Sequence, residues 1–147
     1  EIAEKHLNLN LLTPFILSSV FLARTVSFAI PKVILNISSG ASSHPFSGWS
    51  VYSSSKSGLD MLTRTAGLEQ MAEQNPASIF ALAPGIIETT MQERIRNTDE
   101  NLFPDRNMFI QLYEEGKLTK VDDVAQKIMK SIFNPAIRTG SVLSIDN

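Results

Sequence analysis

The sequence predicts an α/β fold in which helices cover a parallel sheet. Short apolar runs lie at 32–38, 77–85 and 140–146. The first of them, KVILNIS, shows little alternation of apolar and polar residues, as is typical of a parallel strand covered on both faces. Helical patterns precede and separate these runs, and such alternation favours a parallel sheet. We expect one domain over residues 1–147.

Residues 1–29 are predicted to form one long helix. Leu9, Leu12 and Ile16 recur at spacings of three and four, and further apolar residues widen this stripe around most of the helix. A helix of this kind is usually buried on more than one side. Pro14 should kink the helix or remove one of its backbone hydrogen bonds.

The remaining elements follow in order along the chain. A loop of small and turn-forming residues at 39–49 leads into a helix at 50–73. The segment 86–118 mixes apolar and charged residues and is predicted to be irregular or to form short helices. A helix at 121–133 opens with acidic residues, which suit the helix dipole. The apolar side of the helix at 50–73 carries Leu59, Leu62, Ala66 and Met71.

Composition argues against several classes of function. The formal net charge of -2 provides no electrostatic footprint for nucleic acid or an anionic membrane. With no cysteine and two histidines, neither disulfides nor a metal site are expected, and a cytoplasmic location suits the chain. The apolar stretch at 9–30 is interrupted by polar residues such as Asn10 and Arg24, whereas a membrane span needs about 20 mostly apolar residues. We therefore expect no membrane span.

A tyrosine and a lysine stand four residues apart at the start of the helix at 50–73. Tyr52 and Lys56 belong to the stretch VYSSSKSGLD, and this spacing places both side chains on one face of a helix. A nearby ammonium favours the ionised form of a phenol. Such a phenol can donate a proton to a carbonyl oxygen or accept one from an alcohol. The spacing alone also fits an ordinary solvated helix face.

Residues at the ends of the predicted strands converge on this pair. Ser39 ends the first strand and precedes Tyr52 by 13 residues. The Ala-Pro-Gly at 83–85 ends the second strand, and Thr89 follows. Because ligand sites in parallel sheets lie at the carboxyl ends of strands, we expect these residues to meet there.

Together these motifs resemble the short-chain dehydrogenase/reductase family. The resemblance rests on NISS at 36–39, Tyr52-x-x-x-Lys56 and PGIIET at 84–89. The stretches HLNLNLLTPFILSS, SSGASSHPFSGWSVYSSSKSGLDMLT and LAPGIIETTMQ look like the branch of bacterial benzil reductases and sepiapterin reductases. The resemblance covers nearly the whole chain. It implies a Rossmann-like doubly wound parallel sheet, represented here by its C-terminal half of three strands with flanking helices.

The resemblance also implies roles for individual residues. Tyr52 would be the general acid or base, and Ser39 would hydrogen-bond the substrate oxygen. Lys56 would assist Tyr52 and bind the nicotinamide ribose. Asn10, or Asn8 in a shifted register, would hold a water in a proton relay. The implied cofactor-binding residues are Tyr52, Lys56, Pro84, Gly85, Ile87 and Thr89.

The implied function is that of a carbonyl reductase or alcohol dehydrogenase. Hydride would pass between a nicotinamide cofactor and the carbonyl carbon of a ketone, a diketone or a pterin side chain. The nearest branch implies NADP(H) in preference to NAD(H), although the residues present do not separate the two. The segment 86–118 matches a substrate lid. Its apolar residues would suit an apolar or aromatic compound or pack in a core: Met91, Phe103, Met108, Phe109 and Leu112.

The chain departs from the family pattern in its first half. Its seven glycines form no G-x-G-x-x-G, and no Asn-Asn-Ala-Gly segment occurs. The phosphate-binding half of the fold is therefore expected to be absent, and three strands alone would leave an inner sheet edge unpaired. We expect the isolated 147 residues to bind cofactor poorly and to fold with low stability.

Two alternatives stand beside this interpretation. Ser53-x-x-Lys56, with Arg-Thr-Gly at 138–140, would suit a penicillin-recognising acyl transferase, but the Ser-Asp-Asn element of that class is missing. The other alternative is a catalytically inert reductase fragment that acts at most as a dimerisation module. The helices at 1–29 and 50–73 match the elements through which the family pairs its subunits, so a homodimer or homotetramer is expected.

Overall fold

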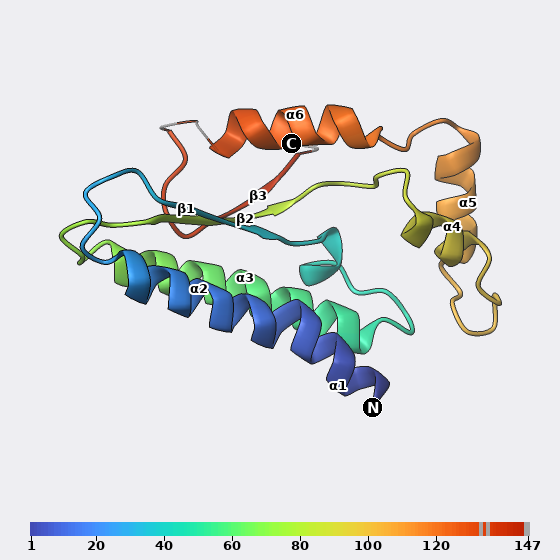
Figure 1. The fold of residues 1–147 in the computed structure, drawn as a ribbon. Coiled ribbons are helices and arrows are strands. Elements are labelled where there is room, and N and C mark those ends of the chain that lie inside the picture. The colour runs from blue at the N-terminus through green and yellow to red at the C-terminus, as the bar shows by residue number, and fades with distance from the viewer. Residues whose placement is uncertain (133, 135, 146–147) are drawn as a thin grey trace.

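The computed structural model describes residues 1–132, 134 and 136–145, and its elements form three layers (Figure 1). A parallel sheet lies between α2 and α3 on one face and α6 on the other, and α4 and α5 lie beyond the carboxyl ends of the strands (Figure 1). The strands are β1 (Val33–Ile37), β2 (Ser78–Ala83) and β3 (Ser141–Ser144). The helices are α1 (Ile2–Leu7), the π-helical η1 (Asn8–Leu12), α2 (Thr13–Thr25), the 3₁₀ turn η2 (Gly40–Ser42), α3 (Ser50–Gln70), α4 (Thr90–Arg96), α5 (Arg106–Glu114) and α6 (Val121–Ile132).

The sheet confirms the predicted parallel α/β class. Its order is β1-β2-β3, with β2 in the centre, and both strand pairs are parallel. In the central strand the side chains from Ile79 to Leu82 are almost fully buried, since β2 is covered on both faces. The three strands lie where the sequence predicts them, each shorter by one residue or more at its ends. Residue 133 of the predicted last helix and residue 146 of the predicted last strand lie outside the described residues.

The first predicted helix forms as α1, η1 and α2, which follow one another without a break. The π turn ends at Leu12, two residues before Pro14, and its wider hydrogen bonding joins the N–H of Thr13 to the carbonyl of Asn8. A proline inside a helix lacks an N–H and its ring crowds the carbonyl four residues earlier. The disturbance expected at Pro14 therefore takes the form of a π turn, which is one of the recognised ways in which a helix accommodates such strain.

The expected burial of this helix on more than one side is wrong. Within η1 and α2 only Ser18 is buried, while Leu12, Phe15 and Leu17 are among the exposed apolar side chains. By length and composition alone, the run Ile2–Thr25 is apolar enough to cross a membrane, a test that core helices also pass. The sequence pattern indicated a wide apolar surface on this helix but not what covers it.

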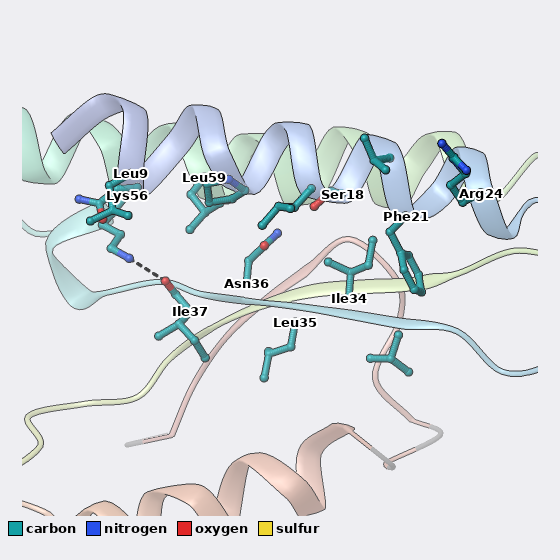
Figure 2. Close-up of a pocket in the computed structure, with 15 residues that line it drawn as sticks. Leu9, Ser18, Phe21, Arg24, Ile34, Leu35, Asn36, Ile37, Lys56 and Leu59 are labelled. Carbon is teal, nitrogen blue, oxygen red and sulfur yellow. Dashed lines mark hydrogen bonds between the residues drawn. The ribbon is translucent and has the colours of Figure 1, made fainter. Parts of the chain in front are cut away.

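Part of that surface lines a groove of about 770 Å³ between α2 and β1 (Figure 2). On the strand side, Ile34 and Asn36 point towards the helices and Leu35 points to the opposite face of the sheet (Figure 2). β1 is an edge of the described sheet, as expected, and it pairs with β2 alone. The groove therefore runs along the open side of β1.

α3 is the helix that packs most closely on the sheet. Leu59 and Ala66 are buried and Leu62 is half-buried, as predicted, but Met71 is 71% exposed. The helix ends at Gln70, whose side-chain oxygen accepts a hydrogen bond from the N–H of Ala77 at 2.9 Å. Met71 therefore follows the helix, and its side chain is not directed into the core.

Two features hold α3 against the strands. Nδ2 of Asn36, on β1, donates to Oγ1 of Thr63 over 2.9 Å, and both side chains are buried. Further along, Gly67 faces the turn before β3, and a Cβ at this position would lie 3.0 Å or less from three backbone atoms of Thr139 and Gly140. Only a glycine permits this approach of helix and turn.

Candidate active site

A cavity of about 390 Å³ lies at the carboxyl ends of β1 and β2. Its walls come from the loop after β1, the start of α3, the segment after β2 and the helices α4 and α5. The predicted site residues that line it are Ser39, Tyr52, Lys56, Pro84, Gly85, Ile87 and Thr89. The structure thus brings together residues that are spread over three segments of the sequence.

Ser39 begins the short turn η2 at the edge of the cavity. Its Oγ accepts a hydrogen bond from the N–H of Ala41 at 3.2 Å, which fixes the side chain as the cap of this turn. The hydroxyl hydrogen of Ser39 is not used in that bond and can be donated to a ligand. The turn is also tied to α3, because Oγ of Ser57 donates to the carbonyl of Ser42 over 2.6 Å.

Tyr52 and Lys56 lie on the same face at the start of α3, as their spacing predicts. Nζ of Lys56 lies 5.8 Å from the centre of the Tyr52 ring. Burial lowers the pKa of Lys56 below its ordinary value of 10.5, while the negative charge of Asp60, one turn further on, acts in the opposite direction. The lysine is therefore a partly desolvated cation beside the tyrosine.

Lys56 also donates a hydrogen bond to the carbonyl oxygen of Ile37, the last residue of β1, over 2.8 Å (Figure 2). The next N–H along the chain, that of Ser38, donates to Leu82 on β2. The two groups of one peptide unit point in opposite directions. The carbonyl that holds Lys56 therefore points away from β2, towards the open side of β1.

The segment after β2 wraps one side of the cavity. Gly85 has a φ of 76°, a left-handed conformation that glycine adopts without strain. The following residues are held by the segment before α6, because Ile86 and Glu88 exchange backbone hydrogen bonds with Thr119 at 2.9 and 3.1 Å. These bonds hold in place the segment from which Ile87 and Thr89 line the cavity.

Asn10 lies apart from the other predicted catalytic residues. It belongs to η1 and lines the groove between α2 and β1, which Lys56 also lines. Lys56 lines both this groove and the cavity at the ends of the strands, and so it connects Asn10 with the other predicted catalytic residues. Asn10 is half-buried, whereas Asn8, the alternative in the shifted register, is exposed.

An aromatic cluster that the sequence analysis missed supports Tyr52. Trp49 stacks on Phe103 with ring centres 5.0 Å apart and meets the ring of Tyr52 edge to face at 5.6 Å. Phe46 and Phe109 complete the cluster, and Phe103 and Phe109 are each only 3% exposed. Both lid residues therefore pack as a core, one of the two roles considered for them, and Phe109 also lines the cavity. The only available signal was a tryptophan three residues before the tyrosine.

Comparison with known proteins places this arrangement in a family. The model of the short chain dehydrogenases matches residues 1–100. The chain belongs to the short-chain dehydrogenase family. A benzil reductase ((S)-benzoin forming) of Bacillus cereus is 38% identical over 141 residues, which are 96% of this chain and 57% of that protein. A sepiapterin reductase of Meriones unguiculatus is 32% identical over 113 residues, 76% of this chain and 41% of its own length.

Solved structures agree with the predicted fold. The KRED1-Pglu enzyme matches 95% of this chain and 57% of its own, with a TM-score of 0.82 at 24% identity, which supports the fold alone. ElxO with NADP bound matches 92% of this chain and 53% of its own, with a TM-score of 0.68 at 29% identity. The chain thus spans between two fifths and three fifths of these proteins. It represents part of a Rossmann-type short-chain dehydrogenase fold.

Proposed function

We propose that the protein is a carbonyl reductase that uses NADP(H) and reduces a ketone or a diketone, with Tyr52 as the general acid. The observation that carries this proposal is that Ser39, Tyr52 and Lys56 line one cavity at the carboxyl ends of parallel strands. Membership of the short-chain dehydrogenase family and likeness to benzil reductases support the same chemistry. A pterin side-chain carbonyl is a third substrate class, supported by the likeness to sepiapterin reductases.

The proposed mechanism assigns one task to each side chain. A substrate carbonyl oxygen would accept hydrogen bonds from the hydroxyls of Ser39 and Tyr52. Tyr52 would transfer its proton to that oxygen as negative charge develops on it. The cation of Lys56 would stabilise the tyrosinate that remains. Asn10 would be positioned to return a proton through water along the groove that it shares with Lys56. In the reverse direction Tyr52 would act as the base.

The residues after β2 fit the nicotinamide end of a cofactor. Pro84, Gly85, Ile87 and Thr89 form a wall beside Tyr52 and Lys56, and the left-handed turn at Gly85 leaves the backbone unobstructed by a side chain. When bound there, the cofactor would supply the hydride for the carbonyl carbon. Lys56 would bind its ribose hydroxyls. Solved structures of this fold hold either NADP, as in ElxO, or NADH, as in 4-hydroxyisoleucine dehydrogenase, and NADP(H) is proposed here because the benzil reductase branch implies it.

Substitution of the two tyrosines of the chain tests the proposal. Tyr52→Phe removes the transferable proton and should lower kcat/KM for ketone reduction by about 100-fold or more. Tyr113→Phe is the matched control, because Tyr113 lies on α5 outside the cavity and stacks with Arg96. It should leave the rate unchanged. Consumption of NADPH in the presence of benzil measures both. Wild-type turnover that persists in Tyr52→Phe would refute the role of Tyr52.

We also propose that the chain self-associates through α1–α2 and α3, as a homodimer or homotetramer. The exposed apolar side chains of the first helix support this, since Leu12, Phe15 and Ile16 are each about half exposed. Contiguous apolar patches of this kind are typical of interaction surfaces. Sedimentation velocity distinguishes the outcomes. A species at twice or four times the chain mass supports self-association, and a monomer at micromolar concentration contradicts it. A dimer with no turnover would instead favour an inert dimerisation module.

A further inference from the structure

Gln92 is a polar side chain in an unusual position in the cavity. It lies on α4, lines the cavity together with Tyr52 and Ser39, and is only 9% exposed. Its side-chain oxygen is buried, and no hydrogen-bond partner for it exists among the residues that the structure describes. Its neighbours on the lid side of the cavity, Met91, Met108 and Phe109, are apolar.

A buried amide oxygen without a hydrogen-bond partner destabilises the protein when no ligand is bound. A glutamine amide offers an acceptor and two donors, and rotation about its last torsion exchanges their positions. The oxygen of Gln92 accepts no hydrogen bond from the described residues. Rotation of the amide therefore breaks no hydrogen bond to this oxygen. A ligand acceptor at that point would therefore gain a hydrogen bond that the neighbouring apolar side chains cannot offer.

The position of Gln92 indicates what that ligand atom is. In the proposed function, Ser39 and Tyr52 bind the carbonyl oxygen that is reduced. Gln92 lines the same cavity from α4, whereas Ser39 and Tyr52 line it from the loop after β1 and from α3. Gln92 can therefore contact a second polar atom of the same substrate. The second oxygen of a vicinal diketone accepts hydrogen bonds and is carried on the carbon next to the reacting one. An amide N–H is a suitable donor for it.

We propose that Gln92 is a specificity-determining residue whose amide donates a hydrogen bond to the second carbonyl oxygen of a vicinal diketone. This inference rests on the proposed function and restricts its preferred substrates to vicinal diketones. Simple ketones then bind only through the reacting carbonyl and their apolar parts, whereas diketones use both polar walls of the cavity.

Two probes that differ by one oxygen test the inference. Benzil carries two adjacent carbonyl groups, and deoxybenzoin carries one on the same diphenyl skeleton. Trp49 is the only tryptophan of the chain and lines the cavity, so quenching of its fluorescence measures the binding of either compound without turnover. Gln92→Met keeps the length of the side chain and removes the amide. Met91→Leu, on the same helix and also in the cavity wall, is the control.

Gln92→Met should raise the Kd of benzil about tenfold, while the Kd of deoxybenzoin changes less than twofold. Met91→Leu should change both by the same factor. The thermal midpoint of Gln92→Met should equal or exceed that of the wild type, since an unpaired buried group is removed. If Gln92→Met is poorly folded, Gln92→Asn provides the same comparison with a shorter amide and should again weaken benzil more than deoxybenzoin.

The results that would contradict the role of Gln92 differ from those that would contradict the reductase proposal. Equal losses for both compounds, or an unchanged Kd for benzil, would overturn the role of Gln92 and leave the reductase proposal intact. Wild-type protein that binds neither compound would contradict the proposed substrate class itself, and the role of Gln92 with it. Loss of turnover in Tyr52→Phe with intact benzil discrimination would support both.

Discussion

Gly67→Ala tests the close approach of α3 to the turn before β3. The new Cβ would lie 3.0 Å or less from three backbone atoms of Thr139 and Gly140, where ordinary contacts begin at 3.4 Å. Backbone cannot rotate aside as a side chain can, so the turn must move. The two shortest hydrogen bonds between that turn and β2 run from the N–H of Gly140 to the carbonyl of Ile79 over 2.6 Å and from the N–H of Ile79 to Oγ1 of Thr139 over 3.0 Å.

The magnitude follows from three effects. Each hydrogen bond contributes about 1 kcal/mol, and overpacking of a core costs about 1 to 3 kcal/mol. Alanine offsets about 1 kcal/mol of this, because it is a better helix former than glycine. Gly67→Ala should therefore lower the free energy of unfolding by about 2 to 4 kcal/mol.

Urea unfolding followed by circular dichroism measures this change. Gly40→Ala is the control, because a Cβ at Gly40 meets nothing within 4 Å, and it should change the free energy of unfolding by less than about 0.5 kcal/mol. A Gly67→Ala protein as stable as the wild type would mean that α3 and the turn can separate without loss, and the packing argument would be refuted.

Two further predictions concern buried polar groups. Because burial lowers the pKa of Lys56 below 10.5, the folded state binds fewer protons than the unfolded state between the lowered pKa and 10.5. The free energy of unfolding of the wild type, relative to that of Lys56→Met, should therefore rise with pH across that window. Urea unfolding of both proteins at several pH values measures this. A difference between the two free energies that does not change with pH would contradict the prediction. Thr63→Val leaves the buried amide of Asn36 without its partner and should cost about 1 to 3 kcal/mol, whereas Thr65→Val at an exposed position of the same helix should cost less than about 0.5 kcal/mol.

The strands and the site motifs could be predicted because their signals are local. An apolar run such as SIFALA is stable in a parallel sheet where both of its faces are covered, and in the structure it is the buried central strand. Ser39 and the start of α3 meet because parallel strands direct their carboxyl ends to one edge. The spacing of Tyr52 and Lys56 fixes their common face in the same way.

The features that were missed depend on contacts between distant segments. Trp49 and Phe103 stack only after the lid folds back over the start of α3, and the position of Trp49 three residues before Tyr52 does not indicate which distant ring it meets. Gln92 was taken as part of a family-like stretch, and its burial without a partner is visible only in three dimensions. For the first helix, periodicity described an apolar surface correctly but could not show that the described chain leaves it exposed.

The hydrogen bond from Lys56 to the carbonyl of Ile37 ties the lysine to the open edge of β1. One donor of the ammonium is used by a main-chain oxygen that points away from the sheet. Any strand that aligned with β1 would compete with the lysine for that oxygen or change its direction. In the proposed function, a cofactor hydroxyl would accept another hydrogen bond from the same ammonium, on the side of the cavity. In the proposed function, strand pairing at β1 and cofactor binding would both depend on where the ammonium of Lys56 is held.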